Sequence, residues 1–426
     1  MLDRTTPPPS QPFAGFQLPR PGTMRLDNGI PFYTFDNPQL ELIHLSIRVE
    51  AGALHETQKQ LSRFCYTLWK ESHPEKNSNE TDDFLDYYGA TLSVTAGICY
   101  ITIQLQFPRK SGGKVIPFVA EMLHRPVFRA HNLELLRAKF IKEFDYQSQK
   151  VDYRNTQLMM HHLFGPKFTF GKILTTSDFE EISLEGIQEY FRETCCAERI
   201  RIFAAGHLDP ETVELVCQHF SRIPNGTPAP MLEDIHADYI PQRIHEEWPD
   251  SLQTSLSLCR PVMKHNDPDS LPFSIFNTLF CNYFGSRLMQ NLREKNGFTY
   301  GISGAPFYYS NGAFFYIESE VNCDKTEEAI EACFTEMRRL QQQAIPKEEM
   351  DTVRNYLLGS AIRTIDGTIT YMRNYIEWND FGEDENRFNQ YVKLIRSIRP
   401  EEITALAEKY LLEQQFTVIT VGKNQN

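Results

Sequence analysis

The sequence lacks several features that would assign it to a common class of protein. No run of about 18 apolar residues occurs, so the sequence offers no membrane-spanning helix. The first 22 residues have no apolar segment of the kind that a secretory signal needs. The nine cysteines are scattered, odd in number and without CxxC spacing, which argues against a disulfide framework or a zinc ribbon. We therefore expect free thiols and a cytoplasmic protein.

Basic residues are outnumbered by acidic ones. There are 43 Lys and Arg residues against 56 Asp and Glu, which gives a formal net charge of −13. Phosphate backbones and anionic lipid surfaces attract basic proteins, so we expect neither a nucleic-acid partner nor a membrane partner. The hydrophobic fraction of 41% is enough for a large core, and 426 residues predict two or three folded domains.

The two halves of the chain repeat one pattern. The segments that close each half match in hydrophobic phase at an offset of 216 residues, and Phe164-Gly165 matches Phe381-Gly382 at an offset of 217. We interpret this as a duplication. The positions matched at an offset of 216 are Ile182, Glu185, Ile187, Ile200, Ile202, Phe203 and Gly206, which correspond to Ile398, Glu401, Ile403, Phe416, Val418, Ile419 and Gly422.

The duplication predicts the fold class and the domain boundaries. We expect an α+β fold of two homologous domains, each an antiparallel-rich sheet covered by helices. Residues 1–22 are interpreted as a Pro-rich arm and residues 23–222 as the first domain. Residues 223–250 contain five prolines and are interpreted as an extended linker, followed by the second domain over residues 251–426.

Four motifs, taken in order, resemble the M16 (insulinase/pitrilysin-like) metallopeptidase family. Leu26–Gly29 (LDNG) and Ala51–Ala53 (AGA) are similar to its LxNG hairpin and to the AG that ends its second strand. Gly206–Pro210 (GHLDP) is similar to its G-x-x-D/N-P element, and Leu292–Tyr300 (LREKNGFTY) to LREKxGxxY. The resemblance covers nearly all of the chain beyond the arm.

The metal-binding motif of that family is missing. An active member carries HxxEH on the helix after the AG: two His ligands and a further Glu hold Zn²⁺, and the Glu of the motif acts as general base. By position, Arg63 replaces the first His, Tyr66 the general base and Thr67 the second His. Glu143, at the place of the third ligand, remains and could instead pair with Arg63. The resemblance therefore implies a degenerate metal site, with no metal or cofactor bound by this chain.

A second functional element of the family is kept. Arg293 and Tyr300 match an Arg/Tyr pair, seven residues apart, that approaches the zinc site when two halves or two subunits close on a peptide. Arg can donate forked hydrogen bonds to peptide carbonyls, and Tyr can donate to the oxyanion. Gly297 fits the end of a helix predicted over 271–294. Without the resemblance, both residues would be interpreted as ordinary parts of a helix end and a strand.

This combination resembles the non-catalytic subunit of two-chain family members. It implies a heterodimer with an HxxEH-containing subunit that holds the zinc, in which this chain assists peptide cleavage in trans and does not cleave by itself. The alternative is an inert structural or peptide-binding homologue, which has no need of the Arg/Tyr pair. Ser93 stands where the family has a substrate-facing Asn on an edge strand, which weakens the case for peptide binding there.

Overall fold

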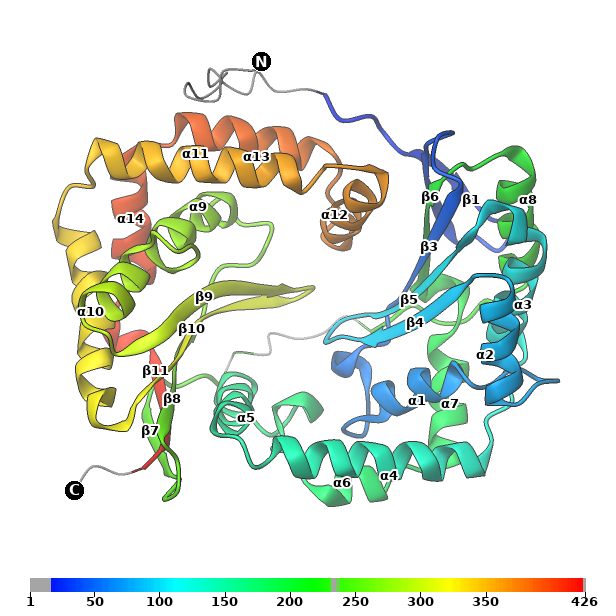
Figure 1. Cartoon of the computed structure of the whole chain (residues 1–426), viewed down its shortest axis with the longest axis horizontal. Helices are drawn as coiled ribbons and strands as arrows, with labels where there is room; N and C mark the ends of the chain where they lie inside the picture. Colours follow the sequence, from blue (N-terminus) through cyan, green and yellow to red (C-terminus); the bar gives the residue numbers. More distant parts are fainter. Residues whose placement is uncertain (1–16, 231–235, 237, 424–426) are drawn as a thin grey trace, which may run out of the picture.

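The computed structural model describes residues 17–230, 236 and 238–423. Two β-sheets face each other across the middle of the molecule, and most of the helices lie on the outer faces of these sheets (Figure 1). The first sheet has the strand order β1-β2-β6-β3-β5-β4, and the second has the order β7-β11-β8-β10-β9. The predicted α+β fold of two similar domains is confirmed.

The first sheet is antiparallel except for the pairing of β2 with β6. The alternation of apolar and polar residues in β5 places every second side chain in the core. The strands are β1 (Gly22–Arg25), β2 (Pro31–Asp36), β3 (Leu42–Val49), β4 (Thr91–Ala96), β5 (Ile101–Pro108) and β6 (Ile200–Gly206). The helices that pack on its outer face are α1 (Leu61–Trp69), α2 (Ser78–Tyr87), α3 (Gly112–His124), α4 (Ala130–Gln147), α6 (Thr176–Glu180), α7 (Leu184–Thr194) and α8 (Pro210–Phe220).

The second sheet is antiparallel except for the pairing of β7 with β11. Its strands are β7 (Arg243–Glu247), β8 (Gln253–Pro261), β9 (Thr299–Tyr309), β10 (Gly312–Asn322) and β11 (Thr417–Gly422). The helices of its core are α9 (Ser270–Cys281), α10 (Thr326–Gln342), α11 (Lys347–Arg363), α13 (Asn386–Ser397) and α14 (Pro400–Tyr410). Strand β7 lies inside the range 223–250, so the second sheet begins within the segment that we interpreted as a linker.

The duplication is visible in the bounds of the elements. Helices α7 and α14 begin and end at positions that differ by 216 residues, and β6 and β11 end at Gly206 and Gly422 with the same offset. Helices α5 (Val151–Phe164) and α12 (Thr368–Asp380) also correspond, since both are followed closely by a glycine with positive φ, 70° at Gly165 and 74° at Gly382.

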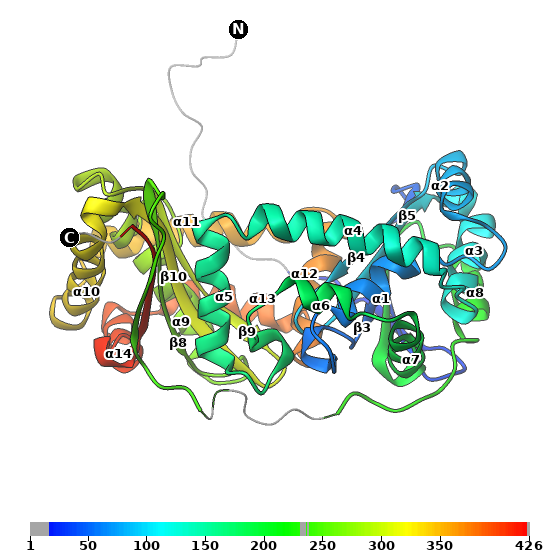
Figure 2. The same ribbon diagram turned by 90° about the horizontal axis from the view of Figure 1, so that it is seen from below.

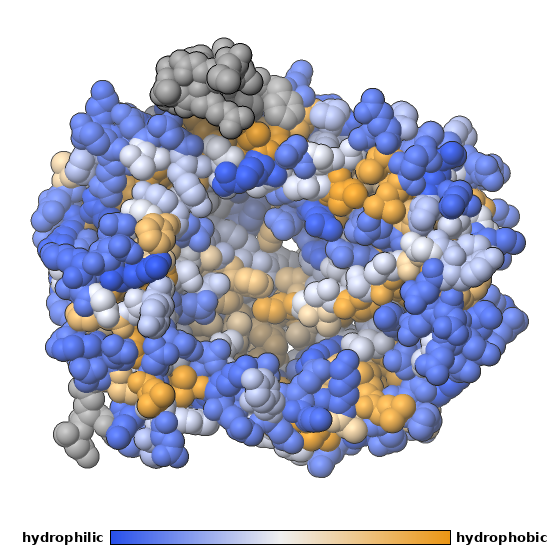
Figure 3. All heavy atoms as spheres, viewed as in Figure 1, coloured by the Kyte–Doolittle hydropathy of each residue, from blue (hydrophilic) through white to orange (hydrophobic). Residues whose placement is uncertain are grey.

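Helices α5 and α12 are exchanged between the halves. Helix α5 belongs to the first half but packs on β8 and β11 of the second sheet, and α12 packs on β2 and β6 of the first sheet (Figures 1 and 2). Apolar side chains from both halves meet beneath each helix, for example Leu158 with Ile419 and Tyr375 with Phe203. Between the two inner faces the molecular surface is hollowed (Figure 3).

Two expectations about composition can be compared with the structure. All nine cysteines are free, and Cys195 and Cys196 are buried at the end of α7. Within the described ranges, no helix has both the length and the apolar character needed to cross a bilayer.

Candidate functional site

Helix α1, which carries the positions compared with the HxxEH motif, begins against a buried carboxylate. Glu56 is 8% exposed and accepts hydrogen bonds from the backbone amides of Gln60 and Ser62, both at 3.1 Å, and from the Ser62 hydroxyl at 2.8 Å. Helix N-termini leave such amides unpaired and favour negative charge. Burial nevertheless raises the pKa of Glu56 to about 7. This contact determines where α1 starts.

The positions of the first and third metal ligands form an ion pair. Arg63 on α1 lies 2.9 Å from the Glu143 carboxylate on α4, and its guanidinium lies 3.9 Å from the centre of the Phe140 ring. The pairing of Arg63 with Glu143 considered from the sequence is therefore present. Both side chains are about 40% exposed, so the guanidinium occupies an open position at the surface of α1.

The remaining positions of the motif do not provide a metal site either. Tyr66 is fully buried, and its hydroxyl lies 2.9 Å from the Thr194 hydroxyl. Burial raises the pKa of Tyr66 well above its usual value, so it cannot replace the carboxylate base. Thr67 is half-buried. Among the residues that the structure describes, no three His, Cys, Asp or Glu side chains lie close enough together to hold a metal ion. The residues of α1 do not fit zinc.

Arg293 and Tyr300 lie on either side of a helix end. The helix predicted over 271–294 is divided into α9 and a seven-residue π-helix, Met289–Lys295, which carries Arg293. Gly297, with φ 63°, ends the π-helix as expected, and its amide donates to the Arg293 carbonyl at 3.1 Å. Tyr300 follows at the start of β9, an edge strand of the second sheet.

The two side chains of this pair are accessible to solvent. Tyr300 is 88% exposed, and the Arg293 guanidinium lies 4.8 Å from the centre of the Phe284 ring. Arg293 also lies 3.5 Å from Glu294. The pair belongs to the second half, whereas α1 packs on the first sheet (Figure 1). In the described part of the chain, no hydrogen bond joins either residue to Arg63 or Glu143.

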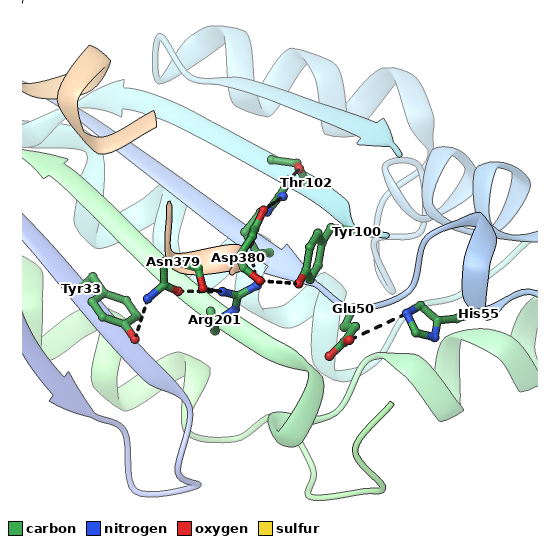
Figure 4. A network of polar contacts seen from close by, with 9 residues as sticks. Tyr33, Glu50, His55, Tyr100, Thr102, Arg201, Asn379 and Asp380 are labelled. Atoms are coloured by element: carbon green, nitrogen blue, oxygen red, sulfur yellow. Dashed lines mark hydrogen bonds and ion pairs between the residues drawn. The ribbon is translucent and has the colours of Figure 1, made fainter. Parts of the chain in front are cut away.

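A polar network at the end of α12 was missed by the sequence analysis. Asp380 accepts hydrogen bonds from Arg48 of β3 and from Arg201 of β6, the latter at 2.7 Å (Figure 4). Arg201 also donates to the side chain of Asn379 at 2.6 Å. Both guanidiniums lie over the Tyr100 ring, at 4.5 Å and 5.1 Å from its centre. The network joins the two halves.

A signal for this network exists in the sequence. Arg48 and Arg201 are charged residues inside largely apolar strands (LIHLSIRV and IRIFAAG), where an inward-facing charge requires a partner. Asp380 lies far away in the sequence, so the partner could not be named. Two further carboxyl groups, Glu50 and Glu377, lie close by, and burial raises the pKa of both.

Two cavities meet at the network. One, of about 490 Å³, lies between the halves and is lined by aromatic side chains including Trp378 and Phe381. The other, of about 570 Å³, is lined by polar groups including Glu50 and Arg199. Tyr100 and Asp380 line both cavities and therefore separate them.

Comparisons with known proteins agree with this geometry. A family model described as the peptidase M16 inactive domain matches residues 181–357. The "Uncharacterized zinc protease YmxG" of Bacillus subtilis is 17% identical over 405 residues, which are 94% of this chain and 97% of that protein. The "Non-peptidase homolog YmxG" of Helicobacter pylori is 19% identical over 75% of this chain and 74% of its own length.

A solved structure shares the whole fold. The crystal structure of a peptidase M16 inactive domain from Pseudomonas fluorescens matches with a TM-score of 0.88 at 18% identity, over 95% of this chain and 98% of that one. The duplicated domains, the ordered motifs and the family match over residues 181–357 agree with one another. The chain is similar to the M16 peptidases over most of its length, and residues 181–357 match the family model described as the peptidase M16 inactive domain.

Proposed function

We propose that this chain is the non-catalytic subunit of a two-chain M16-type zinc peptidase and that it assists the partner's site with Arg293 and Tyr300. The observation that carries the proposal is a contrast between two sites. Helix α1 has an arginine, a buried tyrosine and a threonine where the metal ligands and the base would be. Tyr300, by comparison, is 88% exposed at the start of an edge strand, where its hydroxyl contributes nothing to packing.

The chemistry of the pair suits a site completed by a second chain. The Tyr300 hydroxyl can donate a hydrogen bond to the oxyanion that forms at the scissile carbonyl. The Arg293 guanidinium can donate forked hydrogen bonds to carbonyl oxygens of the bound peptide. Because α1 carries Arg63, Tyr66 and Thr67 in place of the ligands and the base, the metal site that the pair would serve belongs to another subunit. Zinc and the HxxEH motif are assigned to that partner.

Two findings support a non-catalytic role. The matched family model is described as an inactive domain, and one relative is named a non-peptidase homologue. The same findings fit the alternative, an inert structural or peptide-binding homologue. The two functions differ in whether Arg293 and Tyr300 influence turnover.

The experiment uses three samples: this chain, an HxxEH-containing M16 chain that co-purifies with it, and the two co-expressed. Each is assayed on a mixed peptide substrate with added Zn²⁺, with and without a chelator. We expect cleavage by the co-expressed pair only, and its loss with the chelator. Chelator-sensitive cleavage by this chain alone would contradict the proposal. Equal rates for the zinc subunit alone and for the pair would favour the inert homologue.

A further inference from the structure

The cavity of about 490 Å³ between the halves has a wall of aromatic rings. Its lining comes from the turn between β4 and β5, from the β9–β10 hairpin and from the end of α12. It is therefore built by both halves, and it lies beside the network that Figure 4 shows around Tyr100 and Asp380. The rings that line it are those of Tyr100, Phe307, Tyr308, Trp378 and Phe381. Its volume is in the usual range of ligand pockets.

The charged groups of the lining are not equivalent. Arg48 is bound to Asp380, and Arg387 lies 2.8 Å from Glu383, so both cations are already neutralised by carboxylates. Glu377 differs, because within residues 17–230, 236 and 238–423 it has no hydrogen bond and no ion pair.

The surroundings of Glu377 disfavour its negative charge. Desolvation raises the pKa of Glu377, the nearby charge of Asp380 raises it further, and Arg48 opposes this only in part. Its side chain remains accessible from the cavity. A carboxylate of this kind gains most from a cation that enters from outside.

We propose that this cavity binds an organic cation, a guanidinium or alkylammonium group, with Glu377 as its counter-ion and the surrounding rings against its faces. Guanidinium and ammonium groups are attracted to aromatic faces within about 6 Å, more strongly where water is excluded. The same wall already provides such contacts, since Arg48 and Arg201 lie over the Tyr100 ring. The proposal does not depend on the role of Arg293 and Tyr300 in trans.

The cation can come from two sources. One is an Arg or Lys side chain of a peptide that enters the space between the halves. The other is a small free molecule with a guanidinium or amino group. Either would contact both halves at once, so its binding would stabilise their observed arrangement.

The test is a titration of the full chain with two pairs of probes. The first pair is N-acetyl-arginine amide and its citrulline counterpart, which has the same length but no charge. The second pair is a six-residue peptide containing Arg and the same peptide with citrulline. Binding is followed by calorimetry and by the fluorescence of Trp378, with Trp378→Phe to identify that signal. We expect the arginine probe of at least one pair to bind at least 10-fold more tightly than its citrulline counterpart.

Variants locate the site. Glu377→Gln removes the charge and keeps the shape, and we expect it to weaken arginine binding at least 10-fold. Glu401→Gln, at an exposed position of α14, serves as the matched control and should bind like the unaltered chain. Because Glu377 must be ionised to bind a cation, affinity should fall as the pH is lowered from 8 towards the usual carboxyl pKa of 4.5, and Glu377→Gln should lose this dependence. His265 lines the same cavity, and burial lowers its pKa to about 4, so it stays neutral over this range.

The outcomes distinguish a peptide side chain from a small free cation, and three of them would overturn the proposal. Binding of the peptide alone would indicate a peptide side chain, whereas equal binding of the amide would indicate a small cation. Citrulline probes that bind as well as arginine probes would overturn the proposal. So would unchanged affinity in Glu377→Gln, or the lack of saturable binding at millimolar concentrations. Equal urea midpoints for Glu377→Gln and the unaltered chain would show that the variant is folded.

Discussion

Two ion pairs in the molecule differ in burial, and burial determines how much each contributes to stability. The side chain of Asp380 is 7% exposed and binds two arginines that are 18% and 21% exposed. The side chains of Arg63 and Glu143 are 41% and 44% exposed. Removing one partner of a buried pair leaves the other charge desolvated, whereas an exposed pair is screened by water.

We expect Asp380→Ala to lower the free energy of unfolding by about 3 kcal/mol, because Arg48 and Arg201 lose their shared carboxylate. Glu143→Gln should cost less than about 1 kcal/mol, as is usual for exposed pairs. Urea denaturation at neutral pH, followed by circular dichroism, measures both values. Equal losses in the two variants would show that the network at α12 is not a buried charge cluster.

The buried side chain of His44 makes the stability of the folded chain depend on pH. Burial lowers the pKa of His44 to about 4, and Arg373 on α12 contributes to the same direction. The unfolded chain binds this proton near pH 6.5, so His44 has no effect on stability above that pH. It lowers stability progressively as the pH falls from about 6.5 to about 4. Both ring nitrogens of His44 lack hydrogen-bond partners within the described ranges.

We expect His44→Leu to lose less stability than the unaltered chain between pH 7.5 and pH 5.0. At pH 7.5 the two should differ by less than about 1 kcal/mol, since no hydrogen bond is removed. The comparison between variants is needed because Glu56, with a pKa raised to about 7, has the opposite pH dependence. An identical shift of the urea midpoint in both chains would mean that His44 is accessible to water.

At the scale of single residues, the sequence indicated which side chains occupy the positions of the motif better than it indicated how deeply those side chains are buried. The substitutions at Arg63, Tyr66 and Thr67 followed from the resemblance to the M16 family, which also suggested the contact between Arg63 and Glu143. The full burial of Tyr66 could not, because it depends on Thr194 and the packing of α7. The Asp380 network joins residues that are hundreds of positions apart, so no local pattern contains it.

Among the elements, each of the two exchanged helices forms polar contacts with the opposite half of the chain. On α5, the buried side-chain amide of Asn155 donates to the carbonyls of Ser255 at 2.8 Å and Ile419 at 3.2 Å, and accepts from Ser257. Helix α5 is also held by an ion pair, since Arg154 on α5 lies 2.6 Å from Glu246 on β7. Helix α12 is held by charged groups at its end, where Asp380 binds Arg48 of β3. Ser46, on the inner face of the same strand, is buried and has no hydrogen-bond partner among the described residues.

We expect Asn155→Leu to lower the free energy of unfolding by about 2 kcal/mol, because a buried hydroxyl and two carbonyls lose their partner. Hydrogen exchange should rise in β8 and β11, the strands that α5 covers. Thr156→Ala, on the exposed side of α5, is the matched control and should change stability by less than about 0.5 kcal/mol. Similar exchange in both variants would contradict the importance of Asn155.

The boundaries of helices and strands could be predicted from the sequence where the element has one apolar face. Helices α7 and α14 and strands β6 and β11 were recognised by their matched hydrophobic phase. The helix predicted over 271–294 is interrupted near Gly285, where a Cβ atom would lie 2.6 Å from the Tyr283 ring. Strand β7 was missed because it is short and polar, and among the described strands it pairs only with β11, the last one.

For the whole molecule, the exchange of α5 and α12 could not be predicted. An apolar helix face indicates that the helix covers a sheet but not which sheet, and the connecting segments allow both choices. The consequence is large, since the exchange joins two domains into one body around a hollow (Figure 3). It also leaves α1 and the Arg293/Tyr300 pair on separate halves. The pair is assigned to another subunit's site because α1 itself carries no metal ligands.

The most direct test of that assignment is the turnover number of the co-expressed pair carrying Tyr300→Phe. Tyr87→Phe, at an 83% exposed position of α2, is the matched control. Removal of one oxyanion donor should lower kcat by about 10²- to 10³-fold. The control should keep the kcat of the unaltered pair. A Tyr300→Phe pair that cleaves as fast as the control would contradict the role of this chain in the partner's site.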